Sequence, residues 1–75
     1  KKMVIKLNEK ESLRSLDEII TTLKLAGYDP YVQLEGYIET GSDVYITRSN
    51  NAREKIKLLE LDFISKELFR HRNAH

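Results

Sequence analysis

The sequence predicts a mainly α-helical fold: a compact three-helix subunit with a short extended N-terminal segment, forming a helical homodimer. Apolar residues recur at helical spacing in three segments, residues 11–26, 30–40 and 50–70. Residues typical of helix caps and helix ends separate these segments. At 75 residues without cysteine, a single domain over residues 1–75 buries only about 60% of its unfolded surface. Association with a second copy is then the simplest way to bury more.

Charge and hydropathy disfavour two classes of partner. The chain has 13 Lys and Arg residues against 12 Asp and Glu residues, a formal net charge of +1. That balance lacks the basic excess expected of a protein bound to nucleic acid through phosphate contacts. No apolar run approaches the roughly 20 residues of a membrane span, and the "MVIKL" segment is too short for a signal peptide. We therefore expect a cytoplasmic protein without membrane contact.

The first helix is predicted over residues 11–26, after an extended arm over residues 1–10. Ser12 is the expected N-cap, with Asn8 as an earlier alternative, and Gly27 suits the residue that ends the helix. Polar residues face away from a single apolar stripe. The stripe consists of Leu13, Leu16, Ile19, Ile20 and Leu23.

The second helix is predicted over residues 30–40. Asp29 is a suitable N-cap, and the fixed φ of Pro30 suits the first helical position. Gly41 is expected to end the helix. Gly36 lies inside it, where glycine costs about 1 kcal/mol relative to alanine. We therefore expect the backbone of a crossing helix to approach closely at Gly36. A connector with extended character around residues 44–47 is expected to follow.

The third helix is predicted over residues 50–70, with Ser49 or Asn50 as its cap. It carries two apolar faces that lie roughly opposite each other. Burial of both faces requires two neighbours, and in so short a chain the second neighbour is most simply a second copy. The first face consists of Ala52, Ile56, Leu59 and Phe63. The second face, the predicted dimer interface, consists of Leu58, Leu61, Ile64 and Leu68.

Residues that could support catalysis or metal binding are few. His71 and His75 are spaced i, i+4 and could share a divalent metal, but no third ligand is evident, so surface histidines are the favoured interpretation. Carboxylates in the third helix are better explained as solvated charges, because Glu60 and Asp62 do not share a face. No glycine-rich phosphate loop or nucleophile motif is present. We expect no enzymatic activity, no cofactor and no metal.

Tyrosines and basic residues could instead form binding surfaces. The tyrosines could make a partner surface, although closing a small core is the favoured interpretation. They are Tyr28, Tyr31, Tyr37 and Tyr45. The basic residues could form a nucleic-acid footprint, but interleaved Glu54 and Glu60 favour a helix surface with salt bridges. They are Arg48, Arg53, Lys55, Lys57, Arg70 and Arg72.

Taken together, "GYDPYVQLEGY", "TGSDVYI" and "NAREKIKLLELDFISKEL" resemble the IreB family of small regulatory phosphoproteins from Gram-positive bacteria. The resemblance covers residues 16–69 without a break in spacing. The family's Gly-Asp-Pro-Ala is replaced by "GSDV" at residues 41–44. The matching positions are Gly27, Tyr28, Asp29, Pro30, Gln33, Gly36, Tyr37, Gly41, Tyr45, Ile46, Asn51, Ala52, Arg53, Ile56, Glu60, Asp62, Glu67 and Leu68.

The resemblance implies an all-helical homodimer without enzymatic activity. It also implies a protein partner in a serine/threonine kinase pathway that controls the cell-envelope stress response and β-lactam resistance. A family member of this type is phosphorylated on threonines of an N-terminal tail, but residues 1–11 contain no Ser or Thr. Either the tail is lost from this chain or the protein is regulated otherwise. Ser12 and Ser15 lie in the predicted first helix, so the phosphosite is left unassigned.

Overall fold

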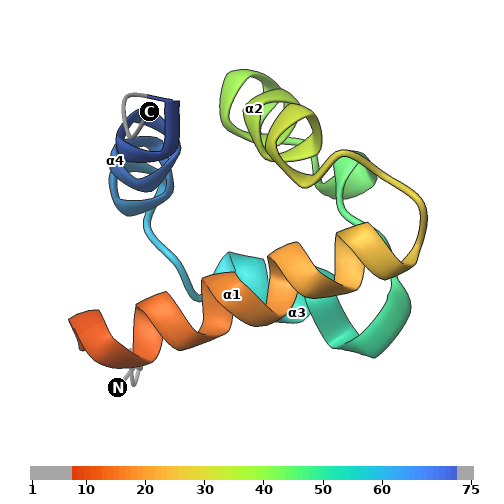
Figure 1. The fold of residues 1–75 in the computed structure, drawn as a ribbon, viewed down its shortest axis with the longest axis horizontal. Helices are drawn as coiled ribbons and strands as arrows, with labels where there is room; N and C mark the ends of the chain where they lie inside the picture. Colours follow the sequence, from red (N-terminus) through yellow and green to blue (C-terminus); the bar gives the residue numbers. More distant parts are fainter. Residues whose placement is uncertain (1–7, 73–75) are drawn as a thin grey trace, which may run out of the picture.

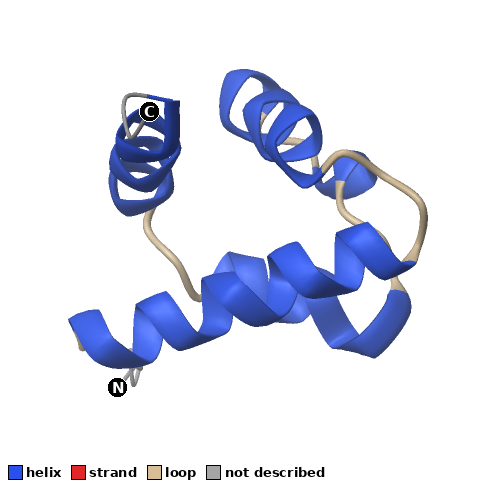
Figure 2. Cartoon of the chain, in the orientation of Figure 1, coloured by secondary structure: helices blue, strands red, loops and turns tan. Residues whose placement is uncertain are grey.

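The computed structural model describes residues 8–72, which form four α-helices and two 3-10 turns (Figures 1 and 2). The prediction of a mainly α fold is confirmed, whereas the count of three helices is wrong. No strand occurs within the described range. Helix α1 packs against α3 and contacts α2, and α2 packs against α4 (Figure 1). The elements are α1 (Glu9–Leu25), α2 (Pro30–Thr40), η1 (Asp43–Tyr45), η2 (Ser49–Asn51), α3 (Ala52–Lys57) and α4 (Leu61–Arg72).

Helix α1 begins earlier than predicted because Asn8, and not Ser12, is its N-cap. The Asn8 side chain accepts from the Glu11 N–H at 2.8 Å, and the Asn8 N–H donates to the Glu11 carboxylate at 3.1 Å. This reciprocal capping box gives an acceptor to two backbone N–H groups, those of Asn8 and Glu11. Glu9 and Lys10 are therefore helical and do not belong to an extended arm. The rest of the predicted arm, residues 1–7, lies outside the described residues.

Helix α2 spans the residues predicted for the second helix. The Asp29 carboxylate accepts from the Tyr31 N–H at 3.0 Å, and Pro30 occupies the first helical position. Gly41 ends the helix with a φ of 71°, a left-handed conformation that glycine adopts without steric cost. Its N–H donates to the Tyr37 carbonyl at 2.7 Å. The connector that follows is a 3-10 turn at η1, not extended as predicted, and extended backbone occurs at Ile46.

The third predicted helix is divided into α3 and α4 by residues 58–60. The N–H groups of Leu58 and Leu59 donate to carbonyls three residues earlier, so the last turn of α3 tightens. Helix α4 then starts in a new direction (Figure 1). Because of this break, residues from both apolar faces predicted for one helix enter a single core. Ile56 from the first face and Ile64 from the second are both fully buried.

The core draws on all four helices and on the connector between α2 and α3. Leu16, Ile19 and Leu23 from the predicted stripe of α1 are buried, as expected for an amphipathic helix. Phe63 and Ile38 pack partly buried against the same cluster. The largest fully buried side chains are Ile19, Leu23, Leu34, Ile46, Ile56 and Ile64.

Removing the N-cap of α1 tests the position of its first turn. We expect Asn8→Ala to lower the free energy of unfolding by about 1 kcal/mol, because the Glu11 N–H loses its acceptor. Ser12→Ala is the matched control and should leave stability within about 0.5 kcal/mol of wild type. Urea unfolding followed by circular dichroism measures both. A larger loss in Ser12→Ala than in Asn8→Ala would show that the helix starts where the sequence alone suggested.

Candidate functional site

Two side chains hold the connector between α2 and α3 in place. The Gln33 side-chain amide of α2 donates to the Tyr45 carbonyl at 2.9 Å, and the Arg53 Nε–H of α3 donates to the Ile46 carbonyl at 2.8 Å. Both bonds are partly shielded from solvent. Ile46 itself is fully buried. We call Gln33, Tyr45, Ile46 and Arg53 the connector clamp, since the two bonds join α2 and α3 to consecutive backbone carbonyls of the connector.

Gly36 explains how closely the connector approaches α2. A methyl group at Gly36 would overlap the ring carbons of Tyr45. The close approach inferred from the sequence is present, but the predicted neighbour of Gly36 is wrong. The neighbour is the ring of a connector tyrosine and not the backbone of a crossing helix. Gly36 therefore provides the space in which the Tyr45 ring packs on α2, beside the connector clamp.

Two asparagines shape the end of the connector. Asn50 and Asn51 have φ values of 53° and 57°, in the left-handed region that asparagine tolerates better than most residues. The Asn50 side chain donates to the Thr22 hydroxyl of α1 at 3.5 Å. Neither predicted cap, Ser49 or Asn50, caps α3, because Asn51 occupies the N-cap position and makes no side-chain cap bond. Helix α3 therefore begins after two residues in the left-handed conformation, without a side-chain cap.

The positions of the family motif divide into structural residues and exposed residues. Those that form turns, caps, the connector clamp or the core are Gly27, Asp29, Pro30, Gln33, Gly36, Tyr37, Gly41, Tyr45, Ile46, Asn51, Ala52, Arg53, Ile56 and Leu68. Tyr28, Glu60 and Asp62 are exposed, and Glu67 is half-buried beside Arg70. Most of the motif therefore maintains the fold, while Tyr28, at 49% exposure, is the tyrosine best placed to contact a partner.

The four leucine and isoleucine residues predicted at a dimer interface are not on one face. Ile64 and Leu68 are 0% and 7% exposed and belong to the core of the chain itself. Leu58 and Leu61 are 49% and 45% exposed, on either side of the break between α3 and α4. The argument from two opposite faces of one helix is therefore wrong, and the dimer stays a prediction that now concerns Leu58 and Leu61.

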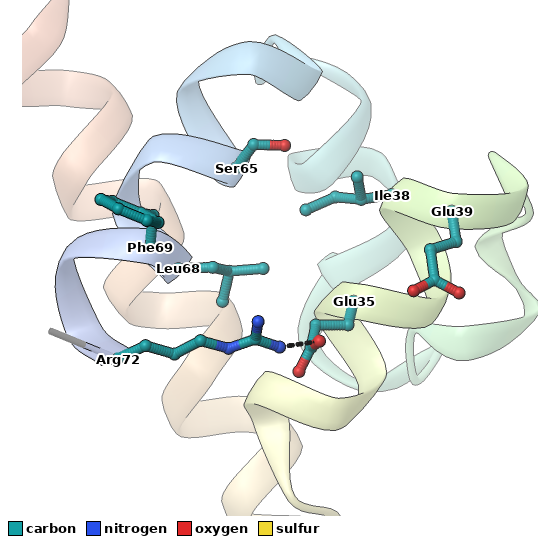
Figure 3. Close-up of a pocket in the computed structure, with 7 residues that line it drawn as sticks. All are labelled: Glu35, Ile38, Glu39, Ser65, Leu68, Phe69 and Arg72. Carbon is teal, nitrogen blue, oxygen red and sulfur yellow. Dashed lines mark hydrogen bonds and ion pairs between the residues drawn. The ribbon is translucent and has the colours of Figure 1, made fainter.

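A groove of about 230 Å³ lies between α2 and α4 (Figure 3). An ion pair between Arg72 of α4 and Glu35 of α2 crosses it. Nearby, the rings of Tyr31 and His71 stack with centroids 3.8 Å apart and planes inclined by 9°. The sequence did not indicate this groove, because it depends on the direction of α4 after the break. Its lining residues are Glu35, Ile38, Glu39, Ser65, Leu68, Phe69 and Arg72.

The candidate metal and acid-base residues do not form a constellation in the described range. His71 stacks on Tyr31, and His75, the other histidine of the proposed pair, lies outside the described residues. Between residues 8 and 72 no three His, Asp or Glu side chains are grouped closely enough to hold a metal ion. Glu67 pairs with Arg70 at 3.2 Å. Glu60 and Asp62 are exposed at the surface.

Four basic side chains form ion pairs in the described range, but their partners are not the interleaved Glu54 and Glu60 of the prediction. Ion pairs link α3 to α1 and to η1, and link α4 to α2, so several of them join different elements. Each involves at least one substantially exposed side chain, for which a contribution of about 0–1 kcal/mol is typical. The pairs are Lys55–Glu18 at 3.6 Å, Lys57–Asp43 at 3.3 Å, Arg70–Glu67 at 3.2 Å, and Arg72–Glu35.

The contact between Gly36 and Tyr45 predicts a coupled effect on stability. Alanine at Gly36 should favour the helix but overlap the tyrosine ring, so we expect Gly36→Ala to lower the free energy of unfolding by about 1–3 kcal/mol. In a Tyr45→Ala background the same change should raise it by up to about 1 kcal/mol. Urea unfolding of the four proteins measures the coupling. Equal effects in both backgrounds would contradict the contact.

None of the described helices is both long enough and apolar enough to pass through a lipid bilayer.

A comparison with protein families matches residues 2–72 to the family described as IreB regulatory phosphoprotein. This match covers nearly the whole chain, and it includes the turns, the connector clamp and α4 described above. The chain therefore belongs to the IreB family of regulatory phosphoproteins.

Proposed function

We propose that this protein is a non-enzymatic, cytoplasmic regulator in a serine/threonine kinase pathway of a Gram-positive bacterium. In this proposal the pathway controls the cell-envelope stress response and β-lactam resistance. The observation that carries the proposal is the family match over residues 2–72, because a regulatory phosphoprotein acts through a partner. The protein would serve as a kinase substrate whose modification changes a binding surface.

The roles of the motif residues support a binding module over an enzyme. Asp29 caps α2, Gln33 and Arg53 bind backbone carbonyls, and Gly36 makes room for Tyr45. These roles maintain a defined surface and leave no motif histidine or serine to act as a base or nucleophile. A protein built in this way presents shape and charge to a partner, which is what the proposed function requires.

A homodimer is part of this proposal, with Leu58 and Leu61 at its interface. Both leucines are nearly half exposed, and they flank the break between α3 and α4. A second copy that covers them would add apolar burial to a chain whose own core is small. Ile64 and Leu68 would support the interface from within the subunit, because they are already buried there.

The alternative function, a small nucleic-acid-binding dimer, has weaker support. The formal net charge is +1, and four of the basic side chains in the described range pair with carboxylates. Such pairs reduce the positive potential that phosphate recognition requires. A regulator that binds another protein therefore agrees better with the charge distribution.

A charge at Leu61 tests the dimer. We expect Leu61→Asp to shift the protein toward monomer while it keeps its helical circular dichroism, because residue 61 is 45% exposed within one chain. Leu25→Asp is the matched control, since Leu25 is 84% exposed at the other end of the fold and lies outside the proposed interface. Sedimentation equilibrium measures the mass. A Leu61→Asp protein that dimerises as strongly as wild type would remove this interface.

Deletion of the gene in its own organism tests the proposed pathway. We expect deletion to change the minimum inhibitory concentration of a β-lactam, while that of a ribosome-targeting antibiotic is unchanged. The wild-type gene and the Leu25→Asp variant should restore the original value. If the β-lactam value is the same with and without the gene, the protein has no role in envelope resistance and the proposed function is wrong.

A further inference from the structure

Ser49 lies in the longest stretch without an α-helix in the described chain. This stretch, residues 41–51, connects α2 to α3 and contains η1 and η2 (Figure 1). Ser49 is exposed, and its hydroxyl accepts from the Thr47 hydroxyl at 3.4 Å, near the upper limit for a hydrogen bond. The left-handed conformations of Asn50 and Asn51 directly follow it and prevent the turn from joining α3 as regular helix.

Other hydroxyl groups of the described chain are less available to a kinase. A kinase must align the acceptor oxygen with the γ-phosphorus of ATP, so an acceptor within an α-helix requires local opening. Thr40 donates to the Gly36 carbonyl at 2.7 Å, Ser42 caps η1, and Thr47 is half-buried. Besides Thr40, the serine and threonine residues within α-helices are Ser12, Ser15, Thr21, Thr22 and Ser65.

The charges around Ser49 suit a phosphate. Between residues 44 and 59 the chain has four cationic side chains and one carboxylate, Glu54. Lys55 and Lys57 of this set pair with acidic residues elsewhere, while Arg48 precedes Ser49 directly and Arg53 lies in the first turn of α3. A phosphate beside arginines forms charge-assisted hydrogen bonds, which are stronger than bonds to a neutral carbonyl.

We propose that Ser49 is a phosphorylation site and that its phosphate acts on the connector clamp through Arg53. This inference rests on the proposed role as a kinase substrate. The Ser49 Oγ attacks the γ-phosphorus of ATP, the bond from that phosphorus to the β–γ bridging oxygen breaks, and ADP leaves. The hydroxyl proton passes to the kinase's catalytic aspartate. The new phosphate then competes with the Ile46 carbonyl for the Arg53 guanidinium.

Release of Arg53 would loosen one of the two bonds of the connector clamp. The Gln33 bond to the Tyr45 carbonyl would remain, so the change would be local to Ile46 and the first turn of α3. The Asn50 contact with Thr22 lies in the same segment and links it to α1. Phosphorylation at Ser49 thus changes a surface shared by the connector, α1 and α3 without unfolding the chain.

Site-mapped phosphorylation tests the site. The full chain is incubated with Mg²⁺, ATP and the serine/threonine kinase domain of the same organism, then analysed by intact mass and tandem mass spectrometry. We expect one phosphate on the peptide that contains Ser49, lost in Ser49→Ala and kept in Ser65→Ala, a control at another exposed serine. Phosphate on a different residue would overturn the Ser49 site while keeping the kinase-substrate function. No phosphate on any residue would overturn both.

The side-chain N–H signal of Arg53 tests the effect on the connector clamp. In ¹⁵N-labelled protein we expect the Arg53 Nε–H resonance to shift on phosphorylation, with smaller shifts at the Gln33 side-chain amide. The Ser49→Ala protein treated with kinase is the control and should show the unmodified spectrum. A phosphorylated protein in which the Arg53 resonance is unchanged would show that the phosphate does not act on Arg53.

Discussion

The anchoring of the connector by Gln33 and Arg53 is the interaction on which the rest of the structure depends. The two side chains come from different helices and bind carbonyls of adjacent residues, Tyr45 and Ile46. Their bonds leave Ile46 in the core, where it contacts a cluster to which every helix contributes. Without them, two carbonyls in a partly shielded segment would lose their partners, which typically costs about 1–3 kcal/mol for each unpaired group. The two bonds therefore tie the connector to both α2 and α3, while α3 itself packs on α1.

The break at residues 58–60 has a comparable influence on what the protein can bind. A continuous helix would present Ile56 and Ile64 to different neighbours, whereas the break allows both to be buried in one subunit. It also brings α4 beside α2, so that Arg72 pairs with Glu35 and the groove between the helices is formed. Leu58 and Leu61 remain exposed at the break. The surface available to a partner is therefore a consequence of the break.

These contacts explain why several positions of the family motif carry the residues they do. Asp29, Gln33 and Arg53 each satisfy backbone groups, and Gly36 accommodates a ring. Residues of this kind specify how a short chain folds, because a small core leaves little stability to offset an unpaired group or a steric overlap. The arrangement agrees with a regulator whose activity resides in the surface that the motif maintains. Ser49 lies on that surface, within four residues of Arg53.

The sequence by itself determined the helical class, the position of α2 and the amphipathic stripe of α1. These features depend on local periodicity and on caps such as Asp29 and Gly41, which act within a few residues. It also indicated a close approach at Gly36. Only the tertiary structure decided that the neighbour there is Tyr45, since contacts between distant segments have no local signature. The break before Leu61 was likewise decided by packing, because it allows Ile56 and Ile64, from the two predicted faces, to be buried in one core.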